Sequence, residues 1–183
     1  MNLKTMENIQ VLDRKFTISI KEEEILKQVD RLAKEINHDL AGKNPLFLSV
    51  LNGAFMFTSD LMKRITIPCE IQFVKLSSYE GMDTTGKVKK MIGLNSDIKG
   101  RTVVIVEDII DTGITMKNLL EDLKAQEPAQ VDVCALLVKP DKLKVDLDLK
   151  YVAMRIPNGF IVGYGLDYDG YGRNYPNIYT VVK

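Results

Sequence analysis

Histidine is nearly absent from this chain, and its scarcity limits the chemistry that the protein can perform. His38 is the only histidine among 183 residues, and we expect it in the last turn of a helix, where a polar or positive group suits solvent and the helix dipole. On that interpretation the chain can form neither a Ser-His nor a Cys-His nucleophile, and no histidine metal cluster. Any catalysis must therefore depend on carboxylates, lysines, backbone amides and metal ions.

The chain also has no net charge, only two cysteines and no long apolar run. Lysine plus arginine and aspartate plus glutamate number 25 each, so no overall attraction to nucleic acid or to a membrane surface is expected. Cys69 and Cys134 are the only cysteines, and their apolar, strand-like surroundings predict buried, reduced thiols. No apolar run approaches the length of a membrane span, and no signal peptide is evident. These absences predict a cytoplasmic protein that binds neither nucleic acid nor membrane.

The stretch RTVVIVEDIIDTGITMKNLL, residues 101–120, carries the strongest functional signal. Residues 103–106 are a β-branched apolar run that predicts a buried strand of a parallel sheet. Glu107 and Asp108 follow at its carboxyl edge, where ligands bind in an open α/β sheet. Residues 111–115 then predict a tight turn and a helix start whose backbone amides can hold a phosphate.

An unusual density of acids surrounds this expected phosphate site. Glu107, Asp108 and Asp111 place their carboxylates within a few residues of the anion, which is repulsive unless something intervenes. The carboxylates can accept hydrogen bonds from sugar hydroxyls, or a divalent cation can lie between them and the phosphate. A ribose 5-phosphate ligand would use both arrangements, whereas a response-regulator domain would use the acids for magnesium alone.

Apolar spacing predicts the elements that precede this stretch. Residues 19–40 have the periodicity of a helix, and Ser19 with Glu22 fits a capping box at its start. Residues 46–51 predict a second buried strand, and residues 54–64 predict a helix after it. The glycine turn between them is another possible anion site.

A long polar loop and a further strand complete the pattern. Residues 70–76 alternate like a strand, and residues 77–90 are polar and aperiodic, as in a lid over a reactive site. Residues 91–94 would return as the second arm of the same hairpin. Residues 131–138 predict another buried strand, and Lys139 stands just past its end, a position at which a lysine is usually solvated.

Four separated segments resemble the type I phosphoribosyltransferase family, and they follow that family's order along the chain. The segments are residues 49–57, 76–86, 103–116 and 139–173. The string VVIVEDIIDTGITM resembles the signature by which these enzymes hold 5-phosphoribosyl-1-diphosphate (PRPP). The string IPNGFIVGYGLDYDGYGRNYPNI resembles the base- and metal-binding segment of the bacterial-type hypoxanthine-guanine members.

This resemblance implies a fold and a domain organisation. The fold would be α/β, with a central, mostly parallel sheet flanked by helices and a small hood formed by the C-terminal segment. Residues 1–183 would form one domain, with its core over about residues 20–150. The hood would comprise residues 151–183 and the N-terminal lead-in, and residues 77–90 would form a mobile loop over PRPP.

The resemblance also implies an activity. The protein would transfer the 5-phosphoribosyl group from PRPP to a 6-oxopurine, hypoxanthine and also guanine, and would form IMP or GMP and diphosphate in purine salvage. Magnesium would be the cofactor, and the subunits would form a homodimer or a homotetramer. The sequence leaves open the relative use of hypoxanthine, guanine and xanthine.

Each position that matches the family motifs takes an expected role, with Asp111 as the catalytic general base for the purine N7 proton. The PRPP-binding residues would be Leu51, Asn52, Gly53, Ser78, Tyr79, Glu107, Asp108, Asp111, Thr112, Gly113, Ile114, Thr115 and Arg173. The purine-binding residues would be Lys139, Phe160, Ile161 and Asp167. The magnesium ligands would be Glu107, Asp108 and Asp167.

Several of these roles have a clear chemical basis. Phe160 would stack on the purine, and the Lys139 ammonium would donate to a 6-oxo group and reject a 6-amino group. Arg173 would reach the diphosphate. In these enzymes the bond between the residues at Leu51 and Asn52 is often a cis peptide, which turns a backbone amide towards the diphosphate.

Two other classes of protein remain possible at this point. A regulator with the same fold could sense a nucleotide and bind RNA without turnover, although the balanced charge counts against an RNA surface. A magnesium-dependent phosphotransfer receiver would use a lysine such as Lys139, but it has no use for residues 160–173 or for a lid over residues 77–90.

Overall fold

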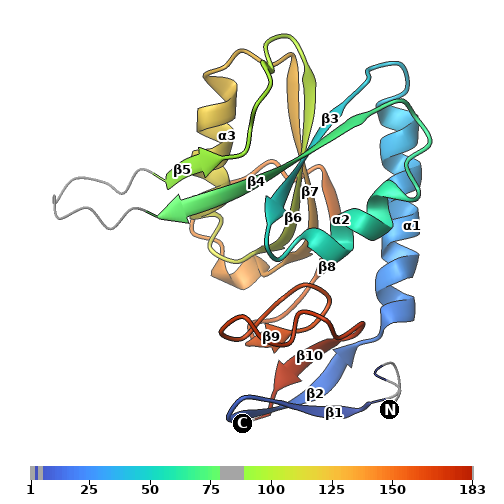
Figure 1. The fold of residues 1–183 in the computed structure, drawn as a ribbon, viewed down its shortest axis with the longest axis vertical. Coiled ribbons are helices and arrows are strands. Elements are labelled where there is room, and N and C mark those ends of the chain that lie inside the picture. The colour runs from blue at the N-terminus through green and yellow to red at the C-terminus, as the bar shows by residue number, and fades with distance from the viewer. Residues whose placement is uncertain (1–2, 4–5, 79–88, 183) are drawn as a thin grey trace, which may run out of the picture.

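The computed structural model describes residue 3 and residues 6–78 and 89–182, and these form two sheets (Figure 1). The main sheet has the strand order β5-β4-β3-β6-β7-β8, and the second, which we call the hood sheet, has the order β1-β2-β10-β9. The strands are β1 Asn8–Val11, β2 Arg14–Ile20, β3 Leu46–Leu51, β4 Glu70–Ser78, β5 Lys89–Ile92, β6 Thr102–Ile110, β7 Gln130–Val138, β8 Tyr151–Arg155, β9 Ile161–Val162 and β10 Ile178–Val181. The helices are α1 Glu22–Asp39, α2 Phe55–Met62, α3 Ile114–Lys124 and the 3-10 helix η2 Pro140–Lys142.

The main sheet confirms the predicted fold class. Strands β4, β3, β6, β7 and β8 are parallel, and only β5 runs antiparallel to its neighbour. Val104 and Val106 of β6 pack with α1 and α2, whereas Val103 and Ile105 pack with α3. Because helices cover both faces, all four side chains are fully buried, which explains why β6 reads as an unbroken apolar run.

Helix α1 begins later than the sequence indicated, and the predicted capping box was wrong. Ser19 lies in β2, where its hydroxyl donates to Ile178 O over 3.1 Å. The Glu22 N–H instead donates to Asn177 Oδ1 over 2.8 Å, so a side chain from the far end of the chain caps the helix. Pairing of β2 with β10 holds Ser19 in an extended conformation and prevents the local cap. His38 lies in the last turn of α1 with its side chain 90% exposed, as predicted.

The chain from Tyr151 onward was expected to leave the main sheet, and for β8 this was wrong. β8 pairs in parallel with β7, with Tyr151 opposite Cys134 and Arg155 opposite Val138. The charges on residues 141–150 hid this strand, because its own apolar positions begin only at Tyr151. Within the C-terminal segment, the hood sheet therefore starts with β9.

The hairpin around the polar loop is confirmed, but its arms have other bounds than predicted: β4 runs on to Ser78, and β5 spans Lys89–Ile92 instead of residues 91–94. β4 and β5 pair antiparallel from Lys75 opposite Ile92 to Ser78 opposite Lys89. The loop between them lies outside the described residues, and the PRPP-binding role expected of Tyr79 falls there. Ser78 is the last residue of β4.

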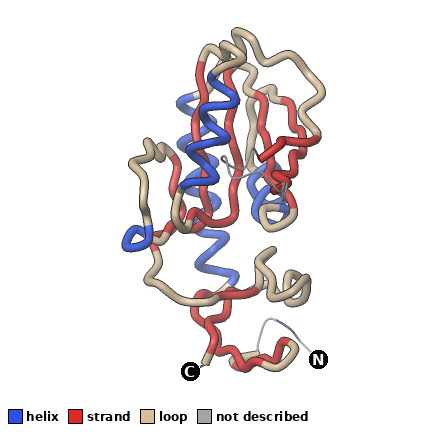
Figure 2. Tube along the Cα trace, turned by 90° about the vertical axis from the view of Figure 1, so that its left-hand side faces the viewer, coloured by secondary structure: helices blue, strands red, loops and turns tan. Residues whose placement is uncertain are grey.

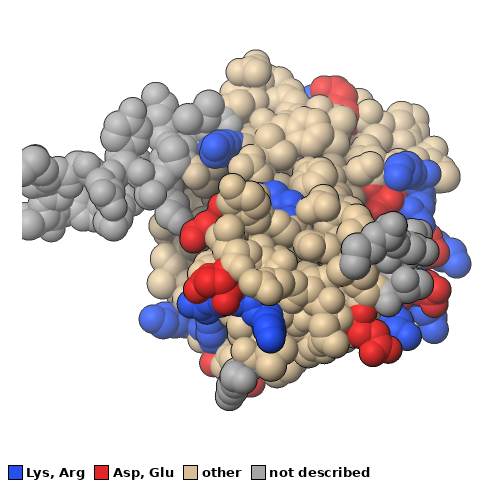
Figure 3. Space-filling view, turned by 60° about the horizontal axis from the view of Figure 1, so that its bottom comes forward, with Lys and Arg blue, Asp and Glu red and all other residues tan. Residues whose placement is uncertain are grey.

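The hood sheet lies below the carboxyl ends of the parallel strands (Figures 1 and 2). The first and last strands of the chain, β1 and β10, both pair with β2 in it. On the face seen in Figure 3, acidic and basic side chains of the described residues are interspersed around a mainly uncharged centre. Among the helices in the described part of the chain, none is both long and apolar enough to cross a membrane.

Candidate active site

A cavity of about 310 Å³ opens where β6 gives way to α3, at the place that the sequence predicted. Five of the predicted site residues line it: Glu107, Asp111, Thr112, Gly113 and Thr115. Val50, Leu76, Ile109, Ile110 and Met116 complete its wall. The cavity thus lies at the carboxyl edge of the sheet, beside the neighbouring strands β3 and β6.

The turn before α3 is shaped to hold an anion. Gly113 is the N-cap residue with φ +79°, and a Cβ there would lie 2.9 Å from Leu147 Cδ1 and from Val145 Cγ2. The first hydrogen bond of the helix runs from the Lys117 N–H to Gly113 O over 2.9 Å. Gly113 also lines the cavity, so the N-terminal turn of α3 faces it. Backbone amides and the positive end of a helix suit a phosphate.

The acidic pair divides between two sides of β6. Glu107 lines the cavity, whereas a Cβ on Gly53 would lie only 1.6 Å from Asp108 Oδ2, so Asp108 faces the turn after β3. Asp108 Oδ1 accepts the Ile109 N–H over 2.8 Å. The two acids were expected to follow the strand together. β6 instead runs on to Ile110, and neighbouring residues of a strand point to opposite faces.

Asp111 lies between the cavity and two lysines. Lys142 Nζ donates to Asp111 Oδ2 over 3.2 Å, and Lys139 Nζ lies 3.9 Å from the same oxygen. Asp111 Oδ1 is buried and has no hydrogen-bond partner among the described residues. A buried carboxylate oxygen without a protein partner is the arrangement expected of a group whose partner is a ligand.

Lys139 is buried, not solvated. Its exposure is 5%, and this burial lowers the pKa of its ammonium, while the nearby Asp111 carboxylate opposes that shift. Lys139 is not among the residues that line the cavity, but it lies beside the cavity-lining Asp111. Keeping a lysine in such dry surroundings costs free energy, which favours a functional role for it. Sequence reasoning missed Lys142, whose only signal was its place three residues after Lys139, in the single turn of η2.

The turn after β3 is held closely by two other parts of the chain. The Leu51–Asn52 peptide bond is cis, as the resemblance implied. Asp108 covers Gly53 from one side, and a Cβ on Gly165 would lie 2.1 Å from Gly53 O on the other. At Gly165 the clash would be with backbone, so only glycine fits there, and the hood loop and the turn after β3 approach each other through backbone contact. At Gly53 a side chain would have to displace the Asp108 carboxylate.

The base-binding candidates lie around the hood sheet. Phe160 is 38% exposed, and its ring centroid lies 6.0 Å from that of Phe16 and 5.4 Å from that of Tyr168. The Arg14 guanidinium lies 5.5 Å from the same ring. Ile161 pairs with Thr180 in the hood sheet. Phe160 and Ile161 are not among the described residues that line the cavity. The structure thus shows an anchored, partly exposed Phe160 ring outside the cavity that Asp111 lines.

Asp167 and Arg173 contact each other. Arg173 Nη2 lies 2.7 Å from Asp167 Oδ1, and the Gly170 N–H donates to Asp167 Oδ2 over 2.6 Å. Glu107, Asp108 and Asp167 are not brought together, and among the described residues no three metal-ligating acids, histidines or cysteines form a cluster. A metal ion held here would therefore need oxygen atoms of the substrate as further ligands.

Comparisons with known proteins agree with this geometry. The family model described as "Phosphoribosyl transferase domain" matches residues 19–169. The chain is 37% identical over 174 residues to a hypoxanthine-guanine phosphoribosyltransferase of Aquifex aeolicus, covering 94% of this chain and 98% of that protein. It is 43% identical to the one from Streptococcus agalactiae over 158 residues, 86% of this chain and 88% of that protein.

Solved structures show the same similarity. A hypoxanthine-guanine phosphoribosyltransferase from Bacillus anthracis superposes with a TM-score of 0.83 at 38% identity, covering 90% of this chain and 98% of that one. A hypoxanthine phosphoribosyl transferase of Trypanosoma cruzi also reaches 0.83, at 32% identity and 95% coverage of both chains.

Proposed function

This chain belongs to the phosphoribosyltransferase family, and on that premise we propose that it transfers the 5-phosphoribosyl group from PRPP to hypoxanthine and to guanine. The products would be IMP or GMP and diphosphate. The observation that carries this proposal is Asp111, which lies on the wall of the cavity with one buried oxygen that lacks a protein partner among the described residues.

The sugar phosphate would be bound by the turn before α3. The amides and hydroxyls of residues 112–115 suit the 5-phosphate, and Glu107 lines the same cavity and suits the ribose hydroxyls. A positive charge that develops on the sugar ring during displacement would be stabilised by this carboxylate.

Asp111 would act as the general base. As the purine N9 attacks the anomeric carbon, N7 must lose a proton, and we assign this proton to Asp111 Oδ1, which has no hydrogen-bond partner among the described residues. Lys142 and Lys139 lie on the Oδ2 side and fix the orientation of the carboxylate. The proton would thus be taken by the one oxygen that faces neither lysine.

The purine would be recognised by Lys139 and the base-binding segment. The buried Lys139 ammonium can donate to a 6-oxo oxygen, whereas a 6-amino group would bring two donors together. Phe160 offers the exposed part of its ring for stacking, and Ile161 offers backbone contacts to the edge of the base.

The diphosphate would leave between the turn after β3 and the hood loop. The backbone N–H of Asn52, which belongs to the cis peptide, and the Arg173 guanidinium are the proposed donors. Since Glu107, Asp108 and Asp167 are not brought together, each would contribute its carboxylate to magnesium separately, and oxygen atoms of PRPP would supply the remaining ligands, because hard oxygen donors suit this ion. When bound, magnesium would neutralise the charge that accumulates on the leaving group.

We further propose that the chain acts as one catalytic domain, in the cytoplasm, and that it assembles as a homodimer or a homotetramer. An exposed apolar patch on α2 and β4, comprising Phe55, Ile71 and Phe73, is consistent with association. The oligomeric state would be read from light scattering of the purified chain.

The test is direct. The purified chain is incubated with PRPP and magnesium and with hypoxanthine, guanine, xanthine or adenine in turn, and nucleotide and diphosphate are measured. We expect nucleotide from hypoxanthine and guanine and almost none from adenine. Retention of RNA without nucleotide synthesis would favour the regulator and contradict the proposal.

A further inference from the structure

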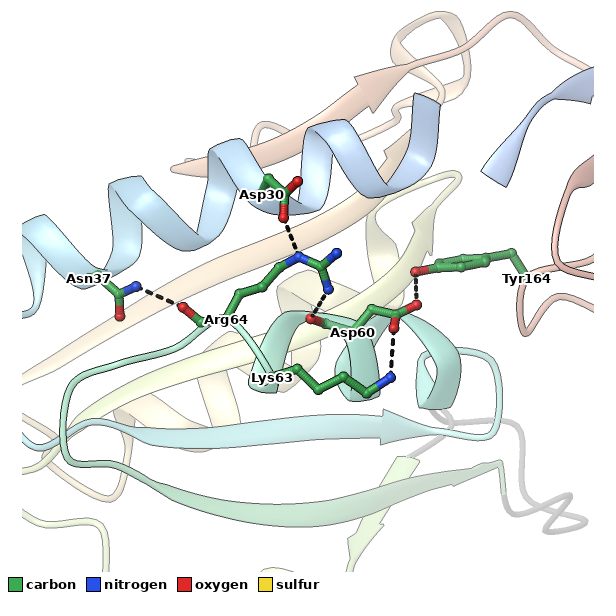
Figure 4. Close-up of polar contacts among 6 residues, drawn as sticks. All are labelled: Asp30, Asn37, Asp60, Lys63, Arg64 and Tyr164. Carbon is green, nitrogen blue, oxygen red and sulfur yellow. Dashed lines mark hydrogen bonds and ion pairs between the residues drawn. The ribbon is translucent and has the colours of Figure 1, made fainter. Parts of the chain in front are cut away.

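Tyr164 is a buried tyrosine in the loop after β9, and it forms a hydrogen bond to α2, a helix that packs against the main sheet. Its side chain is 1% exposed, and its hydroxyl donates to Asp60 Oδ2 on α2 over 2.7 Å (Figure 4). Burial, and then the bonded carboxylate, raise the pKa of the Tyr164 phenol, so it stays protonated and can donate. Tyr164 thereby ties the hood loop to α2 by a charge-assisted hydrogen bond in dry surroundings.

Asp60 is itself held by its neighbours. Lys63 Nζ donates to Asp60 Oδ1 over 3.0 Å, and Arg64 Nη1 donates to the backbone oxygen of Asp60 over 2.8 Å. Arg64 also pairs with Asp30 of α1, and Asn37 Nδ2 donates to Arg64 O over 2.9 Å (Figure 4). The end of α2 is thus fixed to α1, and Asp60 offers Tyr164 a stationary acceptor.

The backbone around Tyr164 depends on such support. Gly163, Tyr164 and Gly165 have φ values of +98°, +49° and +99°. Left-handed backbone is unfavourable for a residue with a bulky side chain, so Tyr164 holds this conformation against its local preference. Two contacts stabilise Tyr164 in this conformation: the hydrogen bond of its hydroxyl, and the packing of its ring within the buried cluster that includes Phe57 and Leu61 of α2.

The residue that follows Tyr164 connects this anchor to the proposed diphosphate site. Gly165 meets Gly53 backbone to backbone, because a Cβ on Gly165 would lie 2.1 Å from Gly53 O. Arg173 Nη1 donates to Gly165 O over 2.7 Å, and Arg173 pairs with Asp167. A shift of Tyr164 away from α2 would therefore move Gly165 and with it the guanidinium of Arg173.

Phe160 and Ile161, two of the residues proposed to contact the base, are held by separate contacts. The Val181 N–H donates to Phe160 O over 2.9 Å, and Ile161 pairs with Thr180 of β10. These bonds lie within the hood sheet and do not involve α2. Loss of the contact between Tyr164 and Asp60 should thus affect the two substrates unequally.

We propose that Tyr164 and Asp60 are positioning residues for the diphosphate of PRPP, acting through the hydrogen bond that fixes the loop carrying Arg173 against Gly53. This inference rests on the proposed function, to which it adds the contact that sets the affinity for one of the two substrates. Neither side chain touches the reacting atoms in this assignment.

The test begins with Tyr164→Phe, which removes only the hydroxyl. We expect the KM for PRPP and the dissociation constant for diphosphate to rise about tenfold, while the KM for hypoxanthine changes by less than about twofold. Asp60→Ala should reproduce this split, and Asp60→Asn, which keeps an acceptor oxygen, should give a smaller rise. The double variant Tyr164→Phe/Asp60→Ala should be no worse than the single variants, because both remove one interaction.

Two matched controls separate positioning from general stability. Tyr151 is also 1% exposed, and its hydroxyl donates to the carboxylate of Asp39, on α1, over 3.1 Å. Tyr151→Phe therefore removes the same kind of hydrogen bond at another place in the fold. It should lower the melting temperature without raising the KM for PRPP. Lys63→Met removes the other contact of the Asp60 carboxylate, and since Lys63 is 66% exposed, it should raise the KM for PRPP far less than Tyr164→Phe does.

Three results would overturn the inference. They are a folded Tyr164→Phe protein with unchanged diphosphate affinity, equal losses for PRPP and hypoxanthine, and the same PRPP defect in Tyr151→Phe. If Tyr164→Phe does not fold, Asp60→Ala carries the same expectation. Lack of turnover by the unmutated chain would instead contradict the proposed function, and diphosphate titration, which needs no turnover, would still test the contact.

Discussion

Lys142 Nζ lies 3.2 Å from Asp111 Oδ2, while the other oxygen of the same carboxylate is buried and lacks a hydrogen-bond partner among the described residues. The two oxygens of Asp111 therefore differ: Oδ2 contacts the ammonium groups of Lys142 and Lys139, and Oδ1 contacts neither. This asymmetry suits a general base, which must be held in place and still accept a proton.

Lys139 should control the choice of purine. Lys139→Ala removes the buried donor that favours a 6-oxo oxygen, so the preference in kcat/KM for hypoxanthine over adenine should fall by about 100-fold or more. The measurement compares both purines with the unmutated chain and the variant. Equal use of adenine and hypoxanthine by the unmutated chain would contradict the role of Lys139.

Lys142 should matter less than Lys139, although it lies closer to Asp111. Its side chain is 42% exposed, against 7% for Lys139, and exposed ion pairs contribute little in water. Lys142→Met should lower kcat by no more than about fivefold, with a smaller effect at high salt. A loss as large as that of Asp111→Asn would show that Lys142 takes a direct part in proton transfer.

Gly53 should not tolerate a side chain. A Cβ there would lie 1.6 Å from Asp108 Oδ2, so Gly53→Ala must displace either that carboxylate or the turn after β3. We expect kcat/KM for PRPP to fall by about 100-fold or more. Gly42→Ala is the control, because no atom lies within 4 Å of its Cβ although φ is +77°. It should reduce stability but not activity, and a Gly53→Ala protein with normal kinetics would refute the close approach.

Buried tyrosines should make the fold sensitive to alkali. Burial raises the pKa of Tyr151 from its usual 10.0 to about 12. Between these values the unfolded chain loses the proton and the folded chain keeps it, so the free energy of unfolding falls as pH rises. Urea unfolding at about pH 9, 10 and 11 should show this fall, and Tyr151→Phe should reduce its slope.

Much of the main sheet and of the phosphate turn could be predicted because the signals are local. Val103 and its three apolar neighbours mark β6 by their own burial, and Gly113 marks the turn by the backbone that only glycine adopts easily. Four of the residues after them, Asp111, Thr112, Gly113 and Thr115, line the cavity in their predicted positions.

The failures occurred where distant segments decide the structure. Ser19 lost its capping role because β10 pairs with β2 and Asn177 caps α1 from the far end of the chain. The parallel partner of Tyr151 likewise comes from β7, which no local pattern reveals. The contacts of Tyr164 with Asp60 and of Gly165 with Gly53 depend on how the hood loop meets α2, so spacing along the sequence could not show them.

Asp111→Asn offers the most direct measurement. PRPP affinity is determined by calorimetric titration, and turnover is determined from diphosphate released in the presence of magnesium and hypoxanthine. We expect the unmutated chain to release diphosphate and IMP in equal amounts, and the variant to retain PRPP binding while kcat falls about 10²–10⁴-fold. An unchanged kcat in Asp111→Asn, or no diphosphate from the unmutated chain with any purine, would contradict the central claim.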